Sequence, residues 1–222
     1  MLKKSFNSGL LEQFYEALEK VLELKAEQKN DEALETINET FSRLFRMNSM
    51  FFDSFSDDNL LDILKVKGVL EKDKTIIIAR LLEEKGVIME SINRTTDSYY
   101  AYLKALNLLL EAYFCDNEAE LEECFSEIDT LINKLSSYEL SYEYTEKLFR
   151  YYEAKNDYAS AEDILYELLE STSSLNETIE NGINFYERLL NKSDEDLEKG
   201  NLPREEVLDS LENLKNKKIK LY

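Results

Sequence analysis

The chain has 222 residues and a formal net charge of −20, with no histidine, one proline and five glycines. An acidic chain repels phosphate, because Lys and Arg supply most affinity for nucleic acid, so we expect no nucleic-acid partner and no anionic membrane partner. The missing histidine removes the commonest general base and zinc ligand, and the scarcity of proline and glycine disfavours all-β folds, which turn often.

Apolar residues recur every three to four positions nearly throughout, which predicts amphipathic helices. A first stripe runs from Leu10 through Phe14 and Leu18 to Leu22, and a second helix follows the polar segment at 28–31. Ser56 precedes two acidic residues and is typical of a helix N-cap, while Gly68 is expected to end that short helix. The apolar run at 75–79 keeps the helical period on both flanks. We therefore expect no strands.

Further stripes predict helices over 77–92, 99–113 and 121–135, and the pattern continues to the C-terminus. Ser193 is expected to begin a single turn that Gly200 ends, and Pro203 stands at a favourable first position for the last helix. We expect about ten helices with short polar connectors in one domain over residues 1–222. The segment STSSLN at 171–176 is the best candidate for a seam between subdomains.

Cys115 and Cys124 lie nine residues apart and lack the close pairing of a zinc or redox motif. We expect two free thiols, buried or half-buried, in a reducing compartment. The N-terminal segment has no unbroken apolar run or cleavage site, and no apolar run reaches the length of a membrane span. The expected location is therefore the cytoplasm, without a signal peptide.

Three segments share the pattern of a tetratricopeptide hairpin, in which small residues let two helices approach closely. The first-helix slot is filled by Val21, Gly86 and Phe149, and a slot twelve residues later by Ala33, Ser98 and Ala161. The first-helix slots lie 65 residues apart (21 to 86) and 63 apart (86 to 149), close to two periods of about 34. These steps predict an all-α fold of antiparallel helix hairpins stacked in a tetratricopeptide-like right-handed superhelix. An irregular helical bundle is the alternative, because an alanine four residues before an aliphatic residue is common in any helix. Phe149 also departs from the small residue usual at its slot.

The segments LFRYYEAKNDYASAEDILYELLE (148–170) and NGINFYERLLNKSDEDLEKGNLPREEV (181–207) follow a short lysine-bearing N-terminus and its amphipathic helix. Through these elements the chain resembles, over nearly its whole length, an uncharacterised family of tetratricopeptide-like helical proteins found in Firmicutes. Asn156 and Asn201 stand at loop points where the resemblance implies glycine, and asparagine also tolerates a left-handed backbone. The resemblance implies the fold and no activity.

Stacks of this kind bind extended partner segments in a concave groove lined by the first helix of each pair. The groove side of the helix around Gly86 would carry Arg80, Glu83, Val87 and Glu90, and the equivalent side around Tyr152 would carry Glu143, Glu146, Arg150 and Glu153. From these we select as candidate partner contacts Arg80, Glu83, Glu90, Glu146, Arg150 and Glu153. In the alternative, Arg80 pairs with Glu83 or Glu84, and Arg150 with Glu146 or Glu153, at helical spacing.

A di-metal carboxylate site in its usual form needs Glu-x-x-His motifs, which a chain without histidine excludes. No Gly-rich phosphate loop, Gly-x-Ser-x-Gly elbow or catalytic cysteine context occurs, so we expect no catalytic residue, metal or cofactor. The expected function is a non-enzymatic cytosolic helical-repeat scaffold that binds a protein or peptide partner. The alternative is a self-assembling, homodimeric structural protein whose exposed tyrosines form the interface. An enzyme ranks third.

Overall fold

The computed structural model describes the backbone of residues 2–171 and 175–219, and side chains from Gly9 onward within those ranges. The chain forms helices packed as antiparallel pairs and divides into two compact units, Met1–Tyr138 and Glu139–Tyr222. Whether the units act as the single domain that the sequence predicts stays a prediction. The seam expected at 171–176 falls within the second unit, and residues 172–174 of it lie outside the described residues.

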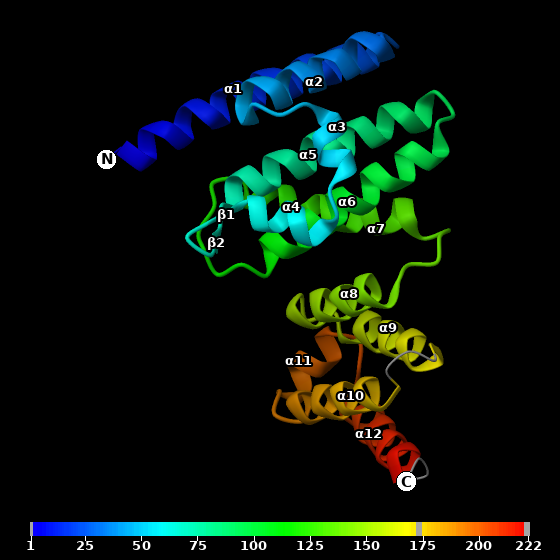
Figure 1. Ribbon diagram of the computed structural model, residues 1–222. Coiled ribbons are helices and arrows are strands. Elements are labelled where there is room, and N and C mark those ends of the chain that lie inside the picture. Colours follow the sequence, from blue (N-terminus) through cyan, green and yellow to red (C-terminus); the bar gives the residue numbers. More distant parts are fainter. Residues whose placement is uncertain (1, 172–174, 220–222) are drawn as a thin grey trace. The chain divides into compact units, whose positions relative to one another are not determined.

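The first unit is built around a central helix pair. Its elements are α1 (Leu2–Ala26), α2 (Asn30–Phe45), α3 (Ser49–Ser54), α4 (Asp57–Ile63), β1 (Lys65–Val66), β2 (Val69–Leu70), α5 (Lys72–Ser91), α6 (Thr95–Tyr113), the 3-10 helix η1 (Glu122–Ser126) and α7 (Glu127–Leu135). Figure 1 shows α1 and α2 side by side, and both pack on α5. Three consecutive isoleucines of α5, residues 76–78, are fully buried, as expected for a helix covered on several sides.

The expectation of no strands is wrong at one place. The helix that begins after the Ser56 cap ends at Ile63, and the next residues form an antiparallel hairpin that pairs Val66 with Val69. Its two turn residues, Lys67 (φ 54°) and Gly68 (φ 79°), are both left-handed, as a hairpin turn of type I′ requires. Gly68 therefore serves a strand turn and does not end a helix. Strands of two residues are too short to produce a visible alternation in the sequence.

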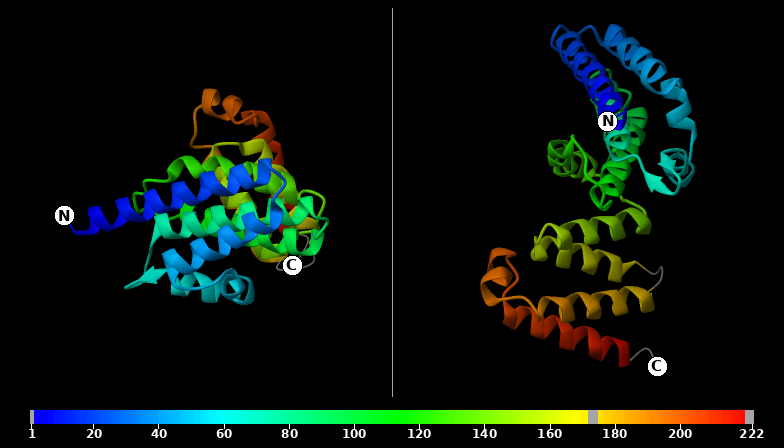
Figure 2. Two further views of the ribbon diagram at one scale, coloured as in Figure 1. Left: turned by 90° about the horizontal axis from the view of Figure 1, so that it is seen from above. Right: turned by 90° about the vertical axis from the view of Figure 1, so that its left-hand side faces the viewer.

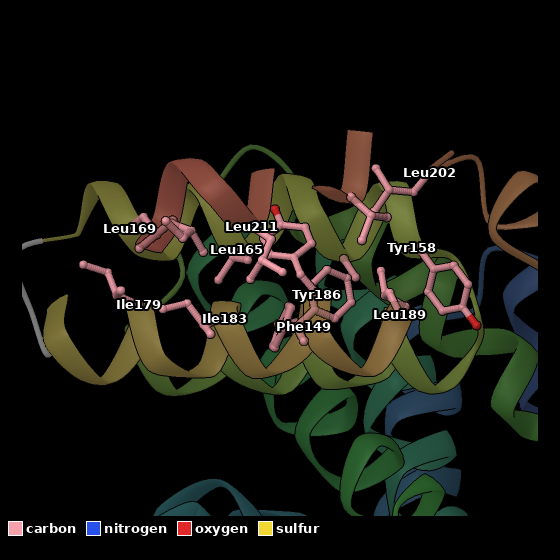
Figure 3. Close-up of a cluster of buried hydrophobic side chains, with 14 of the residues drawn as sticks. Phe149, Tyr158, Leu165, Leu169, Ile179, Ile183, Tyr186, Leu189, Leu202 and Leu211 are labelled. Atoms are coloured by element: carbon pink, nitrogen blue, oxygen red, sulfur yellow. The ribbon is translucent and has the colours of Figure 1, made fainter. Parts of the chain in front are cut away.

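The second unit contains α8 (Tyr142–Ala154), α9 (Tyr158–Glu170), α10 (Leu175–Leu189), α11 (Asp194–Lys199) and α12 (Arg204–Ile219). The right-hand view in Figure 2 shows α8, α9, α10 and α12 in successive layers. Their apolar faces meet in one core, where Phe149, Tyr186 and Leu211 converge from three helices (Figure 3). The expected caps are confirmed: the Ser193 hydroxyl accepts a hydrogen bond from the Asp196 amide at 3.1 Å, and Gly200 follows the last residue of α11.

One turn geometry recurs in the three helix pairs α1–α2, α5–α6 and α8–α9. The turns contain Gln28, Asn93 and Asn156, each with a left-handed φ of 60°. In each, the next amide donates to the carbonyl five residues back, at 2.9, 2.9 and 3.0 Å, which is the Schellman ending of a helix. The turns repeat at the steps predicted from Val21, Gly86 and Phe149. Asn156 and Asn201 (φ 55°) both adopt the expected left-handed conformation.

The small residues of the pattern are covered in the structure. Ala33, Ser98 and Ala161 are all buried. A Cβ on Gly86 would lie 2.6 Å from the ring of Tyr102 on α6, so glycine permits the close α5–α6 contact. Phe149, at the corresponding position of α8, instead packs on Phe185 of α10, with ring centroids 5.1 Å apart. The departure at Phe149 therefore fills the space between two helix pairs within the second unit.

Candidate functional site

The predicted groove side of α5 is largely covered within the first unit. The Arg80 side chain is only 11% exposed, and Glu83 is 5% exposed. The expectation that these two side chains lie on an open surface is therefore wrong. Two elements that are distant from α5 in the sequence, α1 and the η1–α7 segment, pack against this helix and cover its side chains.

Arg80 forms the centre of a buried ionic network. It pairs with Glu83 and, at 3.4 Å, with Glu84 on its own helix, and it lies 3.7 Å from Glu127 of α7. Lys25 of α1 pairs with Glu84 from the other side. The pairing at helical spacing that the sequence offered as an alternative is confirmed for Arg80. Three carboxylates share two cations here, so the network has an excess negative charge.

Burial raises the pKa of Glu83 to about 7, although the adjacent Arg80 acts in the opposite direction. Repulsion from Glu127 and Glu84 adds to the effect of burial. The guanidinium stays protonated at any pH of interest, so a carboxyl is the group that takes up the proton. A network with more carboxylates than cations is expected to hold one of them partly protonated near neutral pH.

Glu90, the third candidate on α5, lies at the exposed end of the same face. It accepts hydrogen bonds from the Tyr102 hydroxyl at 2.8 Å and from the Lys134 ammonium of α7 at 2.7 Å. These bonds lower the pKa of Glu90. Two ion pairs, Arg80–Glu127 and Glu90–Lys134, thus hold α7 against the face of α5 that the sequence assigned to a groove.

The candidates on α8 belong to the second unit and have a different environment. Arg150 is exposed, and Glu146 is half-buried. Glu153 forms a two-pronged ion pair with Arg188 of α10, with N–O distances of 2.7 and 2.8 Å. This pair joins helices 35 residues apart in sequence, so helical spacing alone gives no signal for Arg188. Whether Glu146, Arg150 and Glu153 contact a partner stays a prediction.

Sequence reasoning also missed the role of Lys72, at the start of α5. Its buried ammonium donates to the carbonyls of Cys115 and Asn117, at 3.2 and 2.8 Å, and to Glu122 at 3.0 Å. Lys72 therefore fixes the connection between α6 and η1. No local pattern distinguishes this lysine from its solvated neighbours, because all of its partners lie more than forty residues away.

The apolar stripe in the sequence also predicts the wrong buried face for α1. Leu22 completes an apolar stripe in the sequence, yet it is 46% exposed, and Tyr15 has the same exposure. Together with Leu18, Glu19 and Glu23 they line a shallow hollow, which we call the α1 surface. The buried face of α1 is centred on Phe14 and Val21 instead. The sequence gives one sign of this exposed surface: the apolar residues of α1 cover a wider arc of the helix than the core can bury.

The two cysteines are free and half-buried, as expected. Burial raises the pKa of the Cys124 thiol to about 11; the nearby Arg80 acts in the opposite direction, and repulsion from neighbouring carboxylates adds to the effect of burial. At pH 8 its thiolate fraction should be roughly a hundredfold below that of an ordinary cysteine. We expect iodoacetamide to modify Cys124 slowly in the native chain and at an ordinary rate in denaturant, as followed by peptide mass spectrometry. Equal rates in both states would contradict a raised pKa.

Within the described residues, no group of three or more His, Cys, Asp or Glu side chains is placed to hold a metal ion. None of the helices described has both the length and the apolar character required to cross a bilayer.

The fold and these surfaces define an all-α protein of antiparallel helix pairs, with buried ionic networks that join its helices. The chain belongs to a family described as a family of unknown function (DUF6483), which matches residues 1–218. No curated protein and no solved structure matches the chain.

Proposed function

We propose that the chain is a cytosolic, tetratricopeptide-like scaffold that binds a protein or peptide partner and catalyses no reaction. The observation that supports this proposal best is the recurrence of one helix-turn-helix geometry at steps of 65 and 63 residues. Each step is close to two tetratricopeptide periods of about 34 residues, and hairpins repeated at that period are typical of solenoids that stack in a right-handed superhelix and bind other chains. The resemblance to tetratricopeptide-like proteins of Firmicutes agrees with this assignment.

The predicted contacts divide into two groups under this proposal. Arg80 and Glu83 pair with each other inside the first unit and are covered there, so they are not accessible to a partner. Glu90, Glu146 and Arg150 retain exposed or half-exposed side chains, so we keep them as candidate partner contacts. Glu153 already pairs with Arg188, so only the part of its side chain that stays exposed can contact a partner.

Affinity capture with chemical crosslinking, from the cells that make the protein, tests the proposal. We expect one protein to be retained in near-stoichiometric amount, and light scattering to show a monomer in its absence. A monomer that retains no partner would count against a scaffold. A stable dimer without any partner would favour the self-assembling alternative, for which exposed side chains such as Tyr100 and Tyr166 are the candidate contacts.

A further inference from the structure

The α1 surface presents apolar side chains to solvent on one side of a helix. Tyr15, Leu18 and Leu22 follow one another at spacings of three and four residues and therefore share a face. Tyr15 and Leu22 are among the large hydrophobic side chains that stay exposed. The apolar strip from Tyr15 to Leu22 spans seven steps, or about 10 Å, which matches two turns of a facing helix.

An acidic ridge borders this strip. Glu12, Glu16, Glu19 and Glu23 recur at spacings of four, three and four residues, and all are exposed. None of them forms an ion pair with another side chain that the structure describes. Carboxylates three or four residues apart repel one another along a helix, and Lys20, at helical spacing from Glu16 and Glu23, offsets only part of this repulsion. A cationic partner would relieve that repulsion.

Tyr15 is held in place before any partner arrives. Its hydroxyl donates to Glu123 of η1 at 2.8 Å, and its ring packs on Phe14 with centroids 5.4 Å apart. A fixed aromatic ring loses little conformational freedom on binding, which is the property of interface anchors. The α1 surface and the acidic ridge thus combine a rigid aromatic anchor, two leucines and four carboxylates that have no ion-pair partner among the side chains the structure describes.

We propose that the α1 surface binds a basic, amphipathic helical segment of a partner protein. The partner's apolar side chains would lie on Tyr15, Leu18 and Leu22, and its Lys or Arg side chains would pair with the glutamates of the ridge. This proposal rests on the scaffold function proposed above and specifies its partner class and its contact surface.

A second copy of this chain fits the surface poorly. Two copies of a chain with a net charge of −20 would bring like charges together at the ridge. The lysines near the end of α12 are partly engaged within their own unit, since Lys215 pairs with Glu187 and Lys218 with Glu180. Charge complementarity therefore favours a basic partner over self-association.

Fluorescence anisotropy with a labelled peptide of about 16 residues tests the proposal on the full chain. The probe carries leucines at helical spacing and lysines elsewhere, and a second probe has glutamates in place of the lysines. The variants are Leu22→Ser and the double variant Glu19→Lys/Glu23→Lys. The matched control is Glu35→Lys/Glu39→Lys, which makes the same charge change at the same spacing on exposed positions of α2. Circular dichroism checks that each variant is folded.

We expect the lysine peptide to bind the wild type, and the glutamate peptide not to bind. Each α1 variant should weaken binding about tenfold or more, while the α2 control changes it less than about threefold. Equal losses in the α1 and α2 charge variants would overturn the proposal, because they indicate general attraction to an acidic chain. The proposal would also be overturned if the wild type forms a homodimer and Leu22→Ser converts that dimer to a monomer.

The two proposals fail separately. If crosslinked capture retains the same partner on the wild type and on Leu22→Ser, the α1 surface is the wrong site and the scaffold function stands. If neither chain retains a partner and the lysine peptide does not bind, the scaffold function itself is contradicted.

Discussion

Replacing Gly200 with alanine is expected to lower the free energy of unfolding of the second unit by about 3 kcal/mol. The new Cβ would overlap Cδ2 of Tyr158 and lie 2.8 Å from the Asn156 carbonyl oxygen. Neither neighbour can move easily, because the Tyr158 ring is buried and its hydroxyl donates to the Asn156 side chain at 2.7 Å. The Gly200 carbonyl also accepts from the Ala159 amide at 3.0 Å, so the clash would separate two turns that bond to each other.

Chemical denaturation, followed by circular dichroism, measures this effect. Gly9→Ala is the matched control, because a Cβ on Gly9 meets no atom within 4 Å and the residue lies inside α1. That variant should be neutral or stabilising by up to about 1 kcal/mol, from helix propensity. If Gly200→Ala changes stability by less than about 0.5 kcal/mol, the close approach of the two turns is wrong.

The stability of the first unit should fall as the pH rises from about 4.5 to 7, through the titration of Glu83. Burial raises the folded-state pKa of Glu83 to about 7, above its ordinary value of 4.5. Between these values the folded chain holds a proton that the unfolded chain has released, so rising pH favours unfolding. The full loss amounts to at most about 3 kcal/mol and is complete above the folded-state pKa.

Denaturation curves across this pH range, compared between the wild type and Glu83→Gln, isolate the contribution. The glutamine keeps an oxygen that can accept from Arg80 and has no proton to release, so its stability should vary less with pH. Glu90→Gln on the same helix should have the opposite effect on stability at neutral pH. The pKa of Glu90 is lowered by Lys134 and Tyr102, so its ionised form stabilises the fold at neutral pH and its loss weakens the fold there. Parallel curves for the wild type and Glu83→Gln would contradict the raised pKa of Glu83.

Much of the helical framework follows from the sequence. The turns at Gln28, Asn93 and Asn156 lie at the spacing predicted from the hairpin pattern, and the caps at Ser56 and Ser193 act where expected. Such features depend on hydrogen bonds and backbone conformations within five residues of the chain. Local chemistry was therefore enough to place them.

The candidate site was less predictable. The period of α5 correctly puts Arg80, Glu83 and Glu90 along one face, but it does not reveal that Glu127 and Lys134 of α7 meet that face. For Glu153, helical spacing offers Arg150, whereas the partner that the structure adds is Arg188 on the next helix pair. These contacts join residues roughly 35 to 50 positions apart, and no short-range pattern encodes them.

Gly200 has one role that is visible in the local sequence and one that depends on tertiary contacts. Its position after a single acidic turn was enough to predict that it ends a helix, because a helix ending is a local event. Only the tertiary structure shows that its missing side chain makes room for Tyr158 and the Asn156 carbonyl. By itself the sequence determined most of the helices, several of their endings and the spacing of their turns. The tertiary structure decided which helix faces are covered and which, like the α1 surface, stay open, because burial depends on elements that are distant along the chain.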